Sequence, residues 1–359
     1  MVDLPRVTAV IPVFNGARFI ATAVGSLQQQ TLTDIEIFVV DDGSTDETAT
    51  IVAAIAAADP RVRLLRQPRG GQAVANNLAE AHARAPLLAK LDADDVALPN
   101  RLAAQVRFLE ANPDHGVVGS KAWLIDPEGR RHGVPDRATS SEAIHAHLFR
   151  FKSNPIVTSS VVLRRDLFRA VGGERACFGN CHDLDLWLRL GRMTKIAAID
   201  EPLVEYRVHA DQVSLTHVRQ QAVECVAAFE SAARRDGGLA DSFSATSPGV
   251  TAANLGRLGV SASHLDDIVA AHVHGRHEAL LATGMVEQAR ALLDGFLRTA
   301  DATALTSRRR AYRLLMCGRQ ARHEQRWSAK TVLVVRGGVA LPGALPWLVA
   351  QIAARGLAR

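Results

Sequence analysis

The sequence lacks long apolar runs and contains few cysteines. No stretch of roughly eighteen or more uncharged apolar residues occurs in the 359-residue chain, which argues against a conventional membrane-spanning helix. The four cysteines are too few to form the disulfide scaffold of a chain this long. Residues 1–15 show no basic-then-apolar layout of a secretory signal. We therefore expect a cytoplasmic protein with reduced thiols.

Several ligand motifs are also missing. No G-x-x-x-x-G-K-[ST] loop is present, which argues against a P-loop nucleotidase. No G-x-G-x-x-G follows the first predicted strand, which argues against the usual dinucleotide-binding fold. Cys177, Cys181 and His182 lie close together in the sequence, but no fourth ligand stands at a suitable spacing for zinc. We interpret these cysteines as free thiols.

Composition and charge describe a globular body with a basic end. Hydrophobic residues make up 48% and charged residues 22%, close to the average of soluble globular proteins, so a disordered chain is excluded. The net charge of +5 is uneven, because residues 308–359 carry eleven Lys and Arg against one acid, Glu324. The body is therefore acidic, and the basic tail indicates an anionic surface nearby, either membrane or nucleic acid.

The pattern of elements divides the chain into three parts. Strand and helix signals alternate through residues 1–215, which predicts an α/β domain with a mostly parallel, doubly wound sheet and helices on both faces. Residues 216–330 are rich in Ala, Leu, Arg and His and indicate a helical region. Residues 331–359 are apolar and basic but interrupted by Gly and Pro. They fit a segment lying on a membrane surface or a buried helix with a solvated basic face, and the sequence leaves both open.

Acidic residues follow two of the predicted strands. Asp92, Asp94 and Asp95 come after LLAKL, and Asp41 and Asp42 come after IEIFVV. Ligands of open α/β sheets bind at the carboxyl ends of the strands. Three carboxylates in four residues repel one another unless a cation or hydrogen-bond donors balance them, and hard oxygen ligands suit Mg²⁺ or Mn²⁺. Taken alone, the same residues also fit a solvated acidic turn.

Two further segments carry polar groups at element ends. Asp183 begins an amphipathic helix, where it either caps the helix or points a carboxylate into a cleft. Arg207 and His209 stand at the end of the predicted strand EYRVH.

Taken together, these segments resemble the family-2 glycosyltransferases, which have a GT-A fold. The resemblance covers roughly residues 5–215 and rests on six segments in the same order: VTAVIPVFNGARFIATAVGSLQQQT, IEIFVVDDGSTDET, GGQAVANNLAEAHARAPLLAKLDADDVALPNRLAAQVRFLE, NPIVTSSVVLRRDLFRAVGG, HDLDLWLRL and EYRVHADQVS. It implies a transferase that moves a sugar from a nucleotide-sugar donor, UDP-linked by expectation. The implied acceptor is a hydroxyl of a glycan or lipid-linked saccharide.

The resemblance also implies residue roles. Pro12, Val13 and Phe14 would line the nucleotide site, Asp42 would bind the base with Asp41 beside it, and Asp92 would lie near the ribose. Asp94 would bind Mn²⁺ or Mg²⁺ that bridges the two phosphates, and Asp95 would share that task or face the acceptor. His209 would complete the metal shell or contact the diphosphate, unless it is only a structural residue. Asp183 would be the general base of an inverting displacement.

Two positions depart from the family pattern. His182 stands where Glu often precedes the catalytic Asp, and Asn76 stands where many members have Arg. The phosphate contact of that Arg is then either missing in this chain or supplied from elsewhere, for example by Arg69 or Arg207.

Two alternatives remain at this point. A nucleotidyltransferase would also need an acidic metal cluster, but PVFNGARF matches its Gly-rich basic loop poorly. A degenerate transferase could use the basic tail to bind an anionic partner. Few aromatics are interleaved with the tail arginines and the body is acidic, so we expect no nucleic acid partner and favour an enzyme at the inner face of a membrane.

Overall fold

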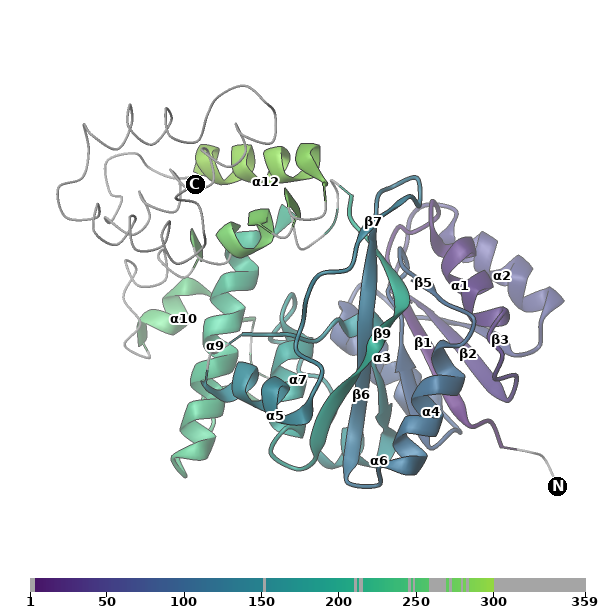
Figure 1. Ribbon diagram of the computed structural model, residues 1–359, viewed down its shortest axis with the longest axis horizontal. Helices are drawn as coiled ribbons and strands as arrows, with labels where there is room; N and C mark the ends of the chain where they lie inside the picture. The colour runs from purple at the N-terminus through teal and green to yellow at the C-terminus, as the bar shows by residue number, and fades with distance from the viewer. Residues whose placement is uncertain are drawn as a thin grey trace. The chain divides into compact units, whose positions relative to one another are not determined.

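The computed structural model of the chain describes residues 4–150, 153–209, 212, 216–244, 247, 249–257, 269–270, 273–278, 280–281 and 284–299 (Figure 1). The chain forms two compact units. One comprises Met1–Arg207 with Glu224–Val250, and the other comprises Val208–Val223 with Thr251–Arg359. Residues 224–250 thus pack with the first unit, although we assigned them to the helical region. The division at residue 215 stays a prediction.

The first half of the central sheet is parallel. Its strands lie in the order β3-β2-β1-β4, and each pair of neighbours runs in the same direction. The chain alternates these strands with helices, as the sequence pattern predicts: β1 (Val7–Val13), α1 (Ile20–Gln28), β2 (Ile35–Asp41), α2 (Thr48–Ala58), β3 (Val62–Arg66), α3 (Gln72–His82) and β4 (Leu87–Lys90).

Every residue of β1 and β2 is buried, because helices cover both faces of these strands. Alternate residues of β1, such as Ala9 and Ile11, belong to one apolar core with side chains of α1, α2 and α4 (Arg101–Ala111). Helix α3 instead contacts β1 and β2 with its own alanine face. Two covered faces explain why these strands are continuous apolar runs.

The second half of the sheet is mixed, which the sequence pattern did not show. β8 runs antiparallel to both β4 and β6, whereas β6 and the long β9 run parallel and side by side (Figure 1). β5 pairs with β9 and β7 with β6, both antiparallel. The bounds are β5 (Val96–Ala97), β6 (His115–Ile125), β7 (Arg131–Gly133), β8 (Val162–Arg164) and β9 (Lys195–Arg207).

Short helical elements connect these strands. They are α5 (Ser141–His145), the π-helical turn η1 (Ala146–Arg150), the 3₁₀ turn η2 (Thr158–Ser160), α6 (Arg165–Ala170) and α7 (His182–Leu190). Helix α7 begins beside the predicted base and buries Leu184, Trp187 and Leu188, as its spacing predicts. Trp187 is therefore a core residue and not a surface for sugar stacking.

The later part of the chain is helical where the structure describes it. Its helices are α9 (Val218–Asp236), α10 (Ala252–Arg257) and α12 (Val286–Thr299). Within the described residues, none of the helices is long and apolar enough to cross a bilayer. The basic tail (residues 308–359), including the predicted segment 331–359, lies outside the described residues.

Candidate active site

The acidic turn after β4 contains a buried carboxylate oxygen that has no hydrogen-bond partner. Asp95 is only 1% exposed. Its Oδ1 accepts a hydrogen bond from the backbone N–H of Arg207 at 2.8 Å, but its buried Oδ2 has no hydrogen-bond partner. Burial and then the charges of Asp94 and Asp92 raise the pKa of Asp95 well above its ordinary value. Burial and then the charge of Asp94 raise the pKa of Asp92 as well.

This unpartnered oxygen fits a divalent cation. A bare carboxylate oxygen in a buried, crowded acidic turn costs free energy that a bound cation would offset. The described residues contain no cluster of three or more metal-ligating side chains, so the turn by itself does not form a complete cage. Magnesium and manganese sites of this kind share the ion with substrate phosphates. Asp94 and Asp95 fit such a shared site, while His209 belongs to the second unit and its role stays a prediction.

Unlike the carboxylate of Asp95, the carboxylate of Asp42 has hydrogen-bond partners on both oxygens. Its Oδ1 accepts hydrogen bonds from Gln67 Nε2 and the Gly70 N–H, both at 2.7 Å. Its Oδ2 accepts from Arg69 Nη1 at 2.8 Å and the Gly71 N–H at 2.9 Å. These four donors use the acceptor capacity of the group. Asp42 therefore holds the turn that leads into α3, and a nucleobase N–H would have to share or displace one of these donors.

The other residues predicted to bind the nucleotide-sugar donor differ in how exposed they are. Asp41 is buried and accepts from the Ser44 N–H at 2.9 Å and from Arg66 Nε at 3.2 Å. Pro12 and Val13 are buried in β1, while Phe14 is 41% exposed. The Arg69 guanidinium lies 3.5 Å from the centre of the Phe14 ring. Of these three predicted residues, only Phe14 has a side chain that is accessible to a ligand.

Arg207 connects the acidic turn to β9. Its backbone N–H bonds to Asp95, as above, and its Nε donates to the backbone oxygen of Asp94 at 2.7 Å. Its Nη1 donates to the backbone oxygens of Asp126 and Pro127 at 3.1 and 3.0 Å. The guanidinium thus fixes the backbone of the turn. Its predicted contact with donor phosphates stays a prediction.

The 3₁₀ turn η2 brings the predicted base to the acidic turn. Thr158 Oγ1 donates to Asp183 Oδ2 at 2.6 Å. The next residue, Ser159, accepts the backbone N–H of Asp92 on its Oγ at 3.1 Å. Adjacent residues of one turn therefore hold Asp183 and Asp92. Asp183 is half-buried, so its carboxylate remains within reach of solvent.

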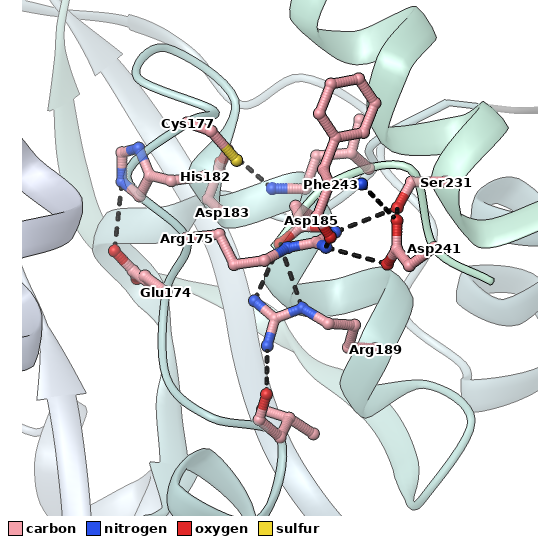
Figure 2. A network of polar contacts seen from close by, with 12 residues as sticks. Glu174, Arg175, Cys177, His182, Asp183, Asp185, Arg189, Ser231, Asp241 and Phe243 are labelled. Carbon is pink, nitrogen blue, oxygen red and sulfur yellow. Dashed lines mark hydrogen bonds and ion pairs between the residues drawn. The ribbon is translucent and has the colours of Figure 1, made fainter. Parts of the chain in front are cut away.

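A balanced network of charges anchors the helix that carries Asp183 (Figure 2). Arg175 Nε donates to Asp185 Oδ2 at 2.9 Å, and Arg189 Nη2 donates to the same oxygen at 2.8 Å. Arg175 Nη1 also donates to Asp241 Oδ2 at 2.8 Å. Burial alone would raise the pKa of Asp241, but hydrogen bonds from Ser231 and the Phe243 N–H and the charge of Arg175 lower it to about 2.

The two cysteines that precede α7 belong to no cluster of three or more metal-ligating side chains within the described residues. Cys177 Sγ contacts the backbone oxygen of Ser244 at 3.5 Å, and burial raises the pKa of this thiol to about 11. Cys177 and Cys181 are free thiols, as expected. His182 directs Nδ1 to the backbone oxygen of Gly179 at 3.2 Å.

Sequence reasoning missed several residues of the site, above all Glu174, Thr158, Lys90 and Gln72. Gln72 Nε2 donates to Asp92 Oδ1 at 2.7 Å from the first turn of α3. Glu174 has a completely buried side chain and contacts Lys90 and His182. Glu174 follows Gly172 and Gly173, a pair that marks a turn, but the sequence shows neither its burial nor its partners.

Comparison with known proteins identifies the family. The sequence profile of glycosyl transferase family 2 matches residues 8–172. The chain is 32% identical over 221 residues to the uncharacterized glycosyltransferase RP339 of Rickettsia prowazekii, covering 60% of this chain and 68% of that protein.

Solved structures share the fold at low identity. S. aureus TarS 1-349 in complex with UDP superposes with a TM-score of 0.52 at 16% identity over 93% of this chain and 92% of that one. The mannosyltransferase PcManGT of Pyrobaculum calidifontis, in complex with GDP-Man and Mn²⁺, superposes with a TM-score of 0.51 at 21% identity. The match covers 90% of this chain and 87% of that one. These likenesses confirm the predicted GT-A fold. Given the profile match and the relative at 32% identity, the chain belongs to glycosyl transferase family 2 and is a glycosyltransferase.

Proposed function

We propose that the protein transfers a sugar from a nucleotide-sugar donor, most simply a UDP-sugar, to a hydroxyl of a glycan or lipid-linked saccharide, with inversion and with Mn²⁺ or Mg²⁺. The observation that carries this proposal is the bridge formed by η2. Thr158 bonds to the carboxylate of Asp183 and Ser159 bonds to the backbone of Asp92. One rigid turn therefore supports both a base and the acidic turn that faces a donor.

The chain's residues divide the chemistry between them. Asp183 accepts the proton of the acceptor hydroxyl while that oxygen forms its bond to the anomeric carbon. The bond from this carbon to the diphosphate oxygen breaks in the same step, and its electron pair leaves with the nucleoside diphosphate. A divalent cation, when bound, supplies charge stabilisation for that leaving group. Asp94 and Asp95 would hold it, and Thr158 orients the base by its hydrogen bond.

The solved structures support the choice of donor and metal by analogy. Two of them are described as complexes with UDP and UDP-GlcNAc, and a third as a complex with GDP-Man and Mn²⁺. The chondroitin synthase of Pasteurella multocida, 26% identical over 224 residues, is a relative whose name indicates a glycan product. A panel of UDP-, GDP- and dTDP-sugars, each with Mn²⁺, Mg²⁺ or a chelator, tests the donor and the metal directly.

Asp183→Asn tests the base. We expect transfer to fall by about a thousandfold, because a general base contributes roughly 10²–10⁴ and its neutral isostere cannot take a proton, while donor binding is retained. Asp166→Asn is the matched control, since Asp166 also begins a helix and accepts the N–H of the following residue, at 2.8 Å. Equal activity of the two variants would exclude Asp183 as the base. A folded wild-type protein that binds no nucleotide sugar would favour the degenerate binding protein.

We propose a peripheral location on the inner face of a membrane, because the excess of Lys and Arg in residues 308–359 suits anionic lipid. Co-sedimentation of the full chain with anionic vesicles, weakened by salt and absent with zwitterionic vesicles, is the expected result. Equal sedimentation with both kinds of vesicle, or with neither, would contradict it.

A further inference from the structure

The catalytic proposal leaves one buried carboxylate without a role. The side chain of Glu174 is completely buried in the loop between α6 and α7. The backbone holds it there: the Glu174 N–H donates to Asn77 Oδ1 at 2.9 Å, and Asn77 Nδ2 donates to the Glu174 backbone oxygen at 2.8 Å. Gly173 precedes it with a φ of +70°, and a Cβ at that position would lie 2.5 Å from Asn77 Oδ1. This double contact and the glycine fix the position of Glu174.

Three side chains surround the carboxylate. Lys90 Nζ, at the end of β4, forms an ion pair with its Oε1. Asn76 Nδ2, from α3, donates to Oε2 at 2.9 Å. His182 Nε2, the residue just before Asp183, lies 3.6 Å from the same oxygen and is buried. Figure 2 shows His182 directed at Glu174, with Asp183 following it on α7.

The two ring nitrogens of His182 face different acceptors. Nδ1 faces the backbone oxygen of Gly179 at 3.2 Å, and because a carbonyl oxygen only accepts, Nδ1 must carry a proton. Nε2 is buried and has no hydrogen-bond partner, so in a neutral ring its lone pair would face the carboxylate of Glu174. An imidazolium places an N–H there instead and forms an ion pair. The geometry therefore suits an imidazolium directed at Glu174, on the residue that precedes Asp183 in the chain.

The same carboxylate connects the donor side of the site to the base. Helix α3 holds Asp92 through Gln72 and holds Glu174 through Asn76 and Asn77. Strand β4 ends in Lys90, two residues before Asp92. The only contact of Glu174 with α7 that the described residues show is with His182.

Both positions at which this chain departs from its family contact Glu174. Asn76 donates to its carboxylate and His182 faces it.

We propose that Glu174 and His182 form a charged pair that positions Asp183 for the transfer step, with Lys90 and Asn76 holding Glu174 in place. This inference rests on the proposed role of Asp183. Glu174 is a positioning residue, because its contacts reach Asp183 only through His182. A buried pair of this kind sets geometry, and loss of one partner leaves the other charge uncompensated.

The test compares Glu174→Gln, His182→Asn and the double variant with Glu36→Gln. Glu36 is a matched control because it is also a buried carboxylate, held by Thr8 at 2.7 Å and by Arg84, and it lies in β2 outside the site. We expect each single variant to lower kcat by about tenfold or more, with the Kd for the nucleotide sugar changed by less than about twofold. Because the two residues act as a unit, the double variant should be no slower than the slower single variant.

Rescue separates a positioning role from a merely structural one. His182→Lys keeps a cation before Asp183 and should recover a large part of the kcat that His182→Asn loses. If Glu174→Gln does not fold, the two His182 variants carry the test. The pair has no role if Glu174→Gln and Glu36→Gln have equal kcat, if kcat and donor affinity fall together, or if Lys gives no rescue.

The wild type and Asp183→Asn are assayed alongside. An active wild type, an inactive Asp183→Asn and an unaffected Glu174→Gln would overturn only this inference. An inactive wild type, or an Asp183→Asn variant as active as the wild type, would overturn the proposed function and the inference with it.

Discussion

Two groups of acids lie close to the proposed site and differ in how they are balanced. Asp185 is buried and Asp241 is partly exposed in the first group, and Asp95 is buried in the second. Asp185 and Asp241 receive Arg175 between them, Asp185 also receives Arg189, and together they anchor α7. In the acidic turn after β4, Asp95 keeps one buried oxygen without any partner. The pKa of Asp241 is lowered to about 2 against the effect of burial, whereas burial and neighbouring acids raise the pKa of Asp95.

The difference separates structure from function. Buried charges that are neutralised by other side chains of the protein hold its elements together. A buried carboxylate oxygen without a partner instead marks a candidate ligand site. By this measure the Arg175 network supports α7, and the acidic turn suits the cation and the diphosphate of the proposed function. Each prediction below changes one member of this comparison.

Asp94→Asn should have the largest effect. We expect transfer to fall about a thousandfold, equivalent to roughly 4 kcal/mol, because the variant removes a charge that holds the cation at the leaving group. The measurement is transfer at saturating donor with Mn²⁺ titrated, and Asp200→Asn, an exposed acid paired with Lys121, is the control. Recovery of full activity at high Mn²⁺ would limit the role of Asp94 to metal affinity.

Asp185→Asn should have the largest effect on folding. The change leaves the buried Arg189 without its anionic partner and removes one of the two carboxylate partners of Arg175. We expect the free energy of unfolding to fall by about 3 kcal/mol, measured by urea denaturation. A loss below about 1 kcal/mol would show that the network contributes little to holding α7.

Asp95→Asn should act in the opposite direction. Without a bound cation, removal of a buried, poorly compensated charge should raise the free energy of unfolding by about 1 kcal/mol while transfer is lost. Urea denaturation in chelator, beside the transfer assay, measures both effects. Destabilisation as large as that of Asp185→Asn would mean that the turn is balanced after all, and the comparison would fail.

The pH dependence should differ in sign between the two groups. The folded pKa of Asp95 is raised, so its contribution to stability is full below its ordinary value of 3.8 and is lost as pH rises through the folded value. The folded pKa of Asp241 is lowered, so its contribution is present above 3.8 and is lost as pH falls toward about 2.

Each group contributes at most about 1.4 kcal/mol per pH unit. The free energy of unfolding is measured against pH, in chelator, for the wild type, Asp95→Asn and Asp241→Asn. The difference between the wild type and each variant gives the pH slope that the replaced carboxyl group contributes. Slopes of the same sign would contradict the assignment.

The sequence predicts the parts that depend on local patterns. Continuous apolar runs identified β1 and β2 because those strands are buried on both faces, and acids at strand ends identified the turn at Asp92–Asp95. The antiparallel β8 is only three residues long and gave no periodic signal. Thr158 and Glu174 could not be found because their partners are distant in sequence: Thr158 bonds to Asp183, and Glu174 to Lys90 and Asn76. The roles of the individual donor residues stay predictions.

Arg207 has a consequence for the order in which the protein matures. The residue that fixes the acidic turn is separated from Asp95 by 112 positions, and Asp241 completes the Arg175 network from 66 positions further along the chain. Such contacts form late, because the intervening chain must be made and brought back first. During synthesis on the ribosome, the four parallel strands can assemble early. If the acidic turn binds the donor as proposed, donor binding should begin only after β9 has emerged.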